Sequence, residues 1–280
     1  MKRLLVAIAL PACVVAGGMG PAYAEDHPML DYFAINVGVF SNNQTATMRV
    51  DGGIKGSGTS LDFSRDLGQG GTKSLPFISA TWRPWDRHEF ELTYFHEDRD
   101  GSRTLNRSID FNGQTILVGS SLGSKFSLDA GSLTYRYWLW IGDNGAFGLT
   151  AGLQTYSLDL RLKGSASISG PNGGATATRT ITASASTDIP DPSIGLSYRY
   201  QMADWARLVA DAGAFKANIG DVDAKLYNAR LGVEFLPWRN FGISTQYAFN
   251  KINADIDKDS FSGRTDFKFN GFQVLLKVRF

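Results

Sequence analysis

One histidine lies among acidic side chains, in the run Phe95-His96-Glu97-Asp98. An imidazole beside carboxylates can act as a general base, or can be oriented by them for that role. The chain has three histidines, and the other two are poorly placed for chemistry at the outer rim, because His27 lies at the N-terminal end and His88 opens a strand beside a predicted short turn. We interpret His96 as the solvated end of a strand and predict no enzymatic activity; a hydrolase site using His96 is the alternative.

Three aspartates have the one-three-five spacing of a calcium-binding loop: Asp255, Asp257 and Asp259, with Asp266 at the twelfth position. An EF-hand needs glycine at the sixth position and flanking helices, but Ser260 stands there and no helix is predicted. We therefore predict neither a metal site nor a cofactor site. An ordinary charged loop explains these residues, and calcium binding stays open as an alternative.

These residues belong to a chain of short segments in which apolar and polar residues alternate, as they do along β-strands. Ten segments show the pattern, and each is weak alone, as is typical of barrels. The stretch 31–51 reads as one long bent strand or as two. The apolar positions of the first nine segments are near 33–39, 78–82, 90–94, 133–141, 147–153, 194–200, 208–214, 227–235 and 243–249.

The tenth segment, GFQVLLKVRF, places an apolar row on one face and a mostly polar row on the other. A strand of this kind ending in Phe resembles the closing strand of bacterial outer-membrane β-barrels. The resemblance implies the outer membrane as location, contact with its lipid and lipopolysaccharide, and recognition of this strand by the barrel-assembly machinery. The row that would carry the assembly signal is Phe272, Val274, Leu276, Val278 and Phe280.

The N-terminal sequence predicts export. Lys2 and Arg3 precede a short apolar stretch at 4–15, and Ala22-Tyr23-Ala24 is typical of a cleavage site, so 1–24 reads as a signal peptide. Residues 25–280 then form one barrel domain. Cleavage removes the single cysteine, Cys13, and leaves 26 basic and 27 acidic residues without a basic cluster. Disulfides, thiol chemistry and nucleic-acid partners are therefore not expected. No run of 18 apolar residues predicts a spanning helix.

The connections between the segments alternate in length. Short turns are predicted at 84–87, 142–145, 203–205 and 238–240, and long connections at 42–74, 98–124 and 164–190. Bacterial barrels have short periplasmic turns and long extracellular loops, so this alternation sets the orientation. All six tryptophans lie near the short-turn end, where an interfacial aromatic belt is expected.

We therefore predict an all-β, antiparallel up-and-down transmembrane β-barrel of about ten strands, with 8 or 12 as alternatives, present as a monomer. A soluble β-sandwich is the competing fold. The segment 58–68, followed by Arg87-His88, also resembles uncharacterised bacterial barrel proteins and implies no activity. In 164–190, the sequence Pro171-Asn-Gly-Gly between small β-forming residues predicts a hairpin that extends above the membrane, against a low-complexity loop.

Charged residues of the strands fall on positions that alternate with the apolar row. A charge facing lipid at the midplane costs roughly 2–4 kcal/mol, so these side chains are predicted to line the lumen. A lumen filled by ion pairs is favoured over a narrow porin-like channel, whose basic excess predicts mild anion preference. Surface recognition or adhesion through 98–124 and 164–190 is the alternative function. The predicted lumen charges are Arg83, Glu89, Glu91, Arg136, Arg199, Arg207, Asp211, Arg230, Glu234, Lys277 and Arg279.

Overall fold

The computed structural model describes residues 27–280, except 52–53, 170–175, 220–221 and 259–260. The predicted signal peptide 1–24 and the turn Pro171-Asn-Gly-Gly lie outside the described residues. No described helix is long and apolar enough to cross a membrane. The strands are β1 (Phe33–Val50), β2 (Leu61–Asp62), β3 (Thr72–Trp85), β4 (His88–Thr104), β5 (Ile109–Phe111), β6 (Gln114–Ile116), β7 (Ser121–Ile141), β8 (Gly145–Ser169), β9 (Thr176–Ala203), β10 (Ala206–Ile219), β11 (Val222–Phe235), β12 (Phe241–Lys258) and β13 (Phe261–Arg279).

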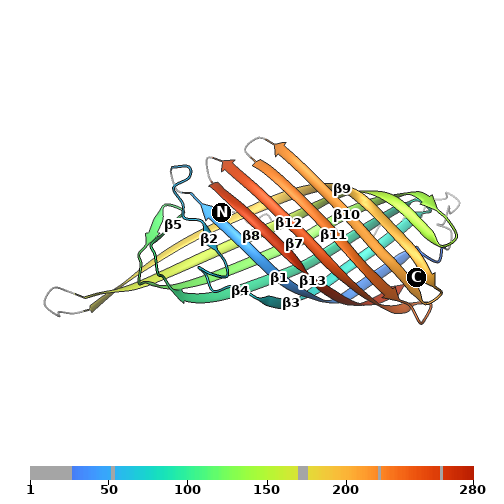
Figure 1. Ribbon diagram of the computed structural model, residues 1–280, viewed down its shortest axis with the longest axis horizontal. Helices are drawn as coiled ribbons and strands as arrows, with labels where there is room; N and C mark the ends of the chain where they lie inside the picture. Colours follow the sequence, from blue (N-terminus) through green and yellow to red (C-terminus); the bar gives the residue numbers. More distant parts are fainter. Residues whose placement is uncertain (1–26, 52–53, 170–175, 220–221, 259–260) are drawn as a thin grey trace, which may run out of the picture.

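Ten long antiparallel strands of the described chain close into a ring of tilted strands (Figure 1). Neighbours in the sequence pair in the order β1, β3, β4, β7, β8, β9, β10, β11, β12 and β13. The ring closes because β13 also pairs with β1, from Ala34 opposite Arg279 to Val50 opposite Gly263. The short strand β2 pairs with β1, and β5 and β6 form a separate hairpin. The predicted antiparallel up-and-down barrel is confirmed.

The strands extend well into the segments that were predicted to be loops. β1 is one continuous strand through 33–50, and β4 and β7 pair as far as Thr104 and Ser121. The predicted long connections 42–74 and 98–124 are therefore too long. β8 and β9 remain paired up to Ser169 and Thr176 and project past the rest of the barrel (Figure 1), which confirms the predicted hairpin in 164–190.

The sequence pattern hid these extensions because the apolar face of the strands changes sides. On β13, Phe272, Val274 and Leu276 point outward and are exposed, whereas Phe267 and Phe269 point inward and are buried. The outward row would face lipid near the short turns. Above that band the outer surface faces water, so the barrel needs an apolar interior there, like a soluble protein. The same reversal occurs on β1, β7, β8 and β12.

The short-turn end carries the predicted aromatic rim with one exception. Five of the six tryptophans are exposed on the outer surface, namely Trp82, Trp85, Trp140, Trp205 and Trp238. Trp138 instead points into the lumen and has 0% of its surface exposed. The prediction that all six belong to the interfacial belt is therefore wrong. A register shift between Trp138 and Trp140 separates the two side chains, so the first joins the lumen and the second the rim.

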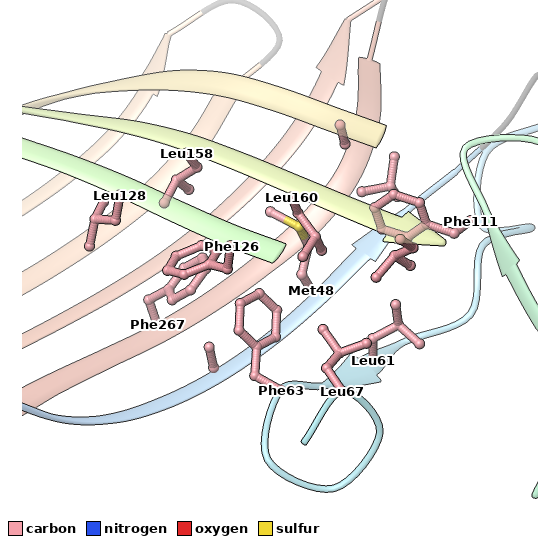
Figure 2. Close-up of a cluster of buried hydrophobic side chains, with 14 of the residues drawn as sticks. Met48, Leu61, Phe63, Leu67, Phe111, Phe126, Leu128, Leu158, Leu160 and Phe267 are labelled. Carbon is pink, nitrogen blue, oxygen red and sulfur yellow. The ribbon is translucent and has the colours of Figure 1, made fainter. Parts of the chain in front are cut away.

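An apolar lid fills the opposite, long-loop end of the barrel (Figure 2). We define the lid as the segments 61–67 and 105–116, which fold over the strand ends. The Phe63 ring from the first segment contacts Phe126 of β7 and Phe267 of β13, with ring centroids 5.1 and 5.5 Å apart. Phe126 and Phe267 also stack on each other, so strands on opposite sides of the ring meet across the interior.

Asp66 joins the two lid segments. Its carboxylate accepts hydrogen bonds from the Asp62 amide at 2.9 Å, Arg65 Nε at 3.0 Å and Arg107 Nη2 at 3.1 Å. Burial raises the pKa of Asp66, but the Arg65 and Asp62 hydrogen bonds and the Arg107 charge outweigh it and hold that pKa below its ordinary 3.8. The stabilisation is therefore complete above the ordinary value and is lost as the pH falls through the lower, folded-state value.

We expect acidification below about pH 3.8 to loosen the lid because protonated Asp66 no longer holds Arg107. Hydrogen exchange of residues 61–67, corrected for the intrinsic pH effect, should rise roughly tenfold, since a hydrogen bond to a charged group contributes on the order of 1.5 kcal/mol. Asp66→Asn should exchange fast at every pH. The control Asp100→Asn, at an exposed outer position, should behave like the wild type; a pH-independent lid in the wild type contradicts the assignment.

Candidate functional site

The lumen near the short turns gathers the predicted charges. The structure places all eleven among the inward-facing groups, where they engage one another or nearby backbone. Their functional role stays a prediction. Eight are buried, namely Arg83, Glu89, Glu91, Arg136, Arg199, Arg207, Glu234 and Lys277. The other three retain partial exposure of the side chain: Asp211, Arg230 and Arg279.

Two ion-pair networks lie in the lumen; we call the one nearer the short turns the lower network and the other the upper network. The upper network centres on Glu91. This β4 carboxylate binds Arg136 of β7 and, at 2.8 Å, Arg230 of β11. Arg136 Nη1 donates to Glu89 at 2.6 Å, and Arg230 Nε donates to Asp211 at 2.8 Å. β4 and β11 are not neighbours in the sheet, so these pairs cross the lumen. Each cation contacts at least two acidic groups, which offsets much of the cost of burying charge.

Arg199 and Trp138 complete the upper network. Arg199 Nη1 lies 3.0 Å from Asp211 Oδ1, and its guanidinium lies 5.6 Å from the centre of the Trp138 ring. Trp138 Nε1 donates to Glu89 at 3.1 Å. The inward tryptophan thus provides an indole hydrogen bond to an acid and an aromatic face to a cation. Its alternation with Leu139 was the sequence signal for this inward position.

The lower network centres on Asp31, an acid that the sequence analysis missed. Asp31 Oδ2 lies 2.7 Å from Arg207 Nη2 and 2.6 Å from Lys277 Nζ, and Asp31 Oδ1 lies 3.2 Å from Arg279 Nη1. Glu234 binds both Arg207 and Lys277, the latter at 2.7 Å. Asp31 precedes the first strand, so no alternation pattern includes it. The predicted excess of seven basic over four acidic lumen groups was the signal that an acid was missing.

The N-terminal segment that carries Asp31 enters the lumen. Met29 and Leu30 are buried against Trp138 and Ala146. Arg83 completes this level, because its guanidinium donates to the Asp31 and Asp86 carbonyl oxygens at 3.4 and 3.3 Å. Met29 and Leu30 therefore add an apolar layer at the short-turn end of the lumen, above which the acidic and basic groups pair.

In the described part of the barrel, a cavity of about 50 Å³ lies among the charged groups, and a larger one of about 140 Å³ lies on the side of the upper network that faces the lid. The larger cavity has room for several water molecules. Its wall combines aromatic rings with hydroxyl and amide groups, from residues that include Phe40, Phe77, Phe95, Tyr156, Thr93, Thr134, Gln154, Asn228, Asn250 and Gln273.

A second buried ion pair lies above this cavity, and the sequence analysis also missed it. Glu97 and Arg99 of β4 bind each other, and both are buried. Asn42 Nδ2 donates to Glu97 at 2.9 Å, and Arg99 Nη1 donates to the Gly71 carbonyl at 2.9 Å. The predicted alternation ended at Tyr94 and the predicted long connection began at Asp98, so these two positions were not considered as lumen groups. Their inward register follows from the continuation of β4.

His96 lies on the outside of the barrel, not in the lumen. Its Nδ1 is 2.9 Å from Asp129 Oδ1, and its Nε2 is 3.0 Å from Asp98 Oδ2. The Tyr94 hydroxyl donates to the same Asp129 oxygen at 2.8 Å. Both ring nitrogens face carboxylates, an arrangement that suits a protonated imidazole and leaves neither nitrogen facing a nucleophile. His88, at the other end of β4, contacts the Tyr135 hydroxyl at 2.7 Å.

The aspartates with calcium-like spacing belong to strands rather than to a loop. Asp255 on β12 binds Arg264 at 2.6 Å, Asp257 binds Lys55, and Asp266 accepts from Asn253 at 2.6 Å. Asp259 and Ser260 lie outside the described residues. Within the described part of the chain, no group of three or more His, Cys, Asp or Glu side chains is arranged to hold a metal ion.

The closing strand presents the predicted assembly row on its outer face, where Phe272, Val274, Leu276 and Phe280 are exposed. The backbones of Phe280 and Phe33 exchange two hydrogen bonds, at 2.8 and 3.2 Å, and extend the pairing of β13 with β1. An accessible apolar row on an outer strand is compatible with recognition by assembly machinery, which stays a prediction.

Several bacterial membrane proteins of known structure are similar to this chain. The Escherichia coli outer-membrane protease OmpT has a TM-score of 0.55 and 13% identity, over 89% of this chain and 96% of that chain. The Pseudomonas aeruginosa outer-membrane protein OprG has a TM-score of 0.37 and 11% identity, over 91% and 100%. The Pseudomonas putida toluene transporter TodX has a TM-score of 0.36 and 12% identity, over 90% and 91%.

No protein-family model matches the sequence, and a comparison with curated proteins gives no match. The likeness to OmpT, whose TM-score is above 0.5, shows that this chain has the fold of a bacterial outer-membrane β-barrel. At these identities the likeness describes the fold and not the activity. The neighbours include a protease, a toluene transporter and a protein that binds a heparin analogue.

We expect Glu91→Gln to lower the free energy of unfolding by about 3 kcal/mol, because it leaves Arg136 and Arg230 buried with one fewer carboxylate. The matched control Asp159→Asn removes the partner of exposed Arg161 and should cost less than about 1 kcal/mol. Urea unfolding in nonionic detergent micelles, followed by tryptophan fluorescence, compares the two. Equal effects would contradict a structural role for the upper network.

Proposed function

We propose that this protein is a non-enzymatic outer-membrane barrel with a sealed lumen, which holds an extended β-structure above the outer leaflet. The carrying observation is that side chains meet across the interior at two levels. At one level Glu91 binds Arg230 across the ring, and at the other Phe126 stacks on Phe267 beneath the lid. Ions would have to break buried ion pairs at the first level and enter an apolar core at the second.

The charge balance of the lumen supports sealing rather than anion transport. A selective pore needs charges that permeating ions can reach. Here Arg136, Arg207 and Lys277 each bind at least two acidic groups, and Asp31 adds a fifth carboxylate to the four that the sequence predicted. Cations that are held by acids in this way support a sealed lumen rather than the mild anion preference expected from the sequence.

The placement of His96 supports the non-enzymatic part of the proposal. A rim hydrolase would need a nucleophile or an activated water near a free imidazole nitrogen. In this protein Asp98 and Asp129 occupy both sides of the ring, and the cluster faces outward from β4. A structural or headgroup-facing role suits that cluster better than acid–base catalysis.

The sealed lumen predicts no steady single-channel conductance from the folded protein in planar lipid bilayers. Insertion would be verified by recovering the heat-modifiable barrel from the membrane. A second protein, with lid residues 61–67 replaced by a short Gly-Ser linker and Glu91→Gln added, should conduct, because both levels are weakened. A steady conductance of the inserted wild-type barrel would overturn the proposal.

Surface recognition is the second candidate function, and the projecting β8–β9 hairpin favours it. The two strands stay paired for the whole distance from Gly145 opposite Tyr200 to Ser169 opposite Thr176, far beyond the strands of β10–β13. A barrel needs no such extension to close. A paired hairpin above the outer leaflet can present its backbone edges to a partner.

Deleting residues 165–187 tests recognition. Cells that display the shortened barrel should adhere less to protein-coated surfaces than cells that display the full chain, by at least severalfold. Heat-modifiable gel mobility must show that the shortened barrel is folded and equally abundant. Unchanged adhesion with a folded barrel would remove the hairpin from consideration and leave the structural role alone.

A further inference from the structure

Four lysines form a continuous row on the outer surface of adjacent strands β10–β13. Lys216 of β10 lies directly opposite Lys225 of β11, and Lys251 of β12 lies directly opposite Lys268 of β13. Lys225 and Lys251 are diagonal neighbours, because Tyr227 is the residue opposite Lys251. We call these four residues the lysine row.

The register makes the lysine row costly for the isolated barrel. Like charges directly opposite one another in an antiparallel pair destabilise the sheet, and this row contains two such pairs. Among the described residues, no salt bridge involves any of the four lysines. Three acids lie one step higher: Asp255 binds Arg264, Asp266 accepts from Asn253, and Asp223 lies opposite Asp255. None of them forms a salt bridge with the row among the described residues, so the four lysines lack ion-pair partners there.

The position of the lysine row indicates where the counter-charge comes from. On β11 and β12 the row follows directly after the outward apolar band, after Tyr227 and after Phe249, and on β13 only Asn270 separates Lys268 from Phe272. Lys268 Nζ lies 5.7 Å from the centre of the Phe249 ring. The band ends where the hydrocarbon ends, so the lysines lie at the depth of the outer-leaflet headgroups.

The other side of the barrel has the opposite charge near this height. There the apolar band is followed by Tyr94, His96 and Asp98 on β4 and by Asp129 on β7. The barrel thus has one basic and one acidic flank at the headgroup level. Anionic headgroups bind the basic flank directly, whereas the acidic flank would need cations between.

We propose that the lysine row binds the phosphate groups of phosphorylated outer-leaflet lipid, such as lipopolysaccharide. A lysine ammonium is an effective point charge for phosphate, and clustered cations near a membrane surface attract anionic lipid. The apolar band below, with Tyr227, Tyr247 and Phe249 at its upper edge, contacts the acyl chains of the same lipid molecule. This combination distinguishes a lipid from free phosphate.

The test compares lipid retention by three purified barrels in nonionic maltoside micelles with a divalent-ion chelator present. The first is the wild type, and the second carries Lys225→Gln, Lys251→Gln and Lys268→Gln. The third is a matched control with the same loss of charge on the far side, Lys125→Gln, Arg161→Gln and Lys163→Gln. The added probes are lipopolysaccharide, the same material with its lipid phosphates removed, and inorganic phosphate.

We expect the lysine-row variant to retain at least tenfold less lipopolysaccharide than the wild type, and the control to stay within about twofold. The dephosphorylated lipid should bind the wild type as weakly as the variant does. Equal loss of lipopolysaccharide by both variants would show that retention depends on net charge alone. Competition by inorganic phosphate at the same concentration as the lipid would show that the row binds a free anion. Either result overturns the proposal.

A second measurement keeps the proposal testable if retention is difficult to quantify. In micelles without anionic lipid, the lysine-row variant should resist urea at least as well as the wild type, because cross-strand repulsion is removed. Added lipopolysaccharide should raise the unfolding midpoint of the wild type and of the control, but not that of the variant. A variant that unfolds earlier without lipid would show that the lysines stabilise the barrel by themselves.

Discussion

The absence of water in the hydrocarbon core is the constraint on which this structure depends. Every backbone group of a spanning strand must find a partner in the sheet, so an open edge within the membrane is excluded. The pairing of β13 with β1 removes the last edge. Once the ring is closed, the inside and the outside of each strand have different solvents, and this difference decides where every side chain can lie.

The inner and outer surfaces of the barrel exchange polarity along the length of the strands. Near the short turns the barrel is apolar outside and charged inside, and beyond the membrane it is polar outside and apolar inside. The charged interior is stable because acids and bases are matched across the lumen, and the apolar interior because lid residues such as Phe63 fill it. The larger cavity lies between the two regions, where neither type of interior is complete.

The strands, the topology and the lumen charges could be predicted because alternation against lipid is a local pattern. Positions 272, 274 and 276 reveal the face of β13, and the charges on the other face follow from the cost of placing them in lipid. The strand extensions could not be predicted in the same way, because the alternation reverses at residues such as Phe267 and Phe269. Asp31 was out of reach for a different reason, since it belongs to no strand and its partners lie at the far end of the chain. His96 was placed on the correct strand, but its outward direction came only with the register.

The Asp31 network has a consequence for the order of folding. Its partners Lys277 and Arg279 lie on β13, and 248 residues separate Asp31 from Arg279. These two contacts cannot exist until β13 has reached β1, whereas the contact of Asp31 with Arg207 of β10 does not require β13. The complete set of ion pairs at Asp31 therefore forms only in a closed ring, and it distinguishes a finished barrel from every intermediate with an unpaired edge.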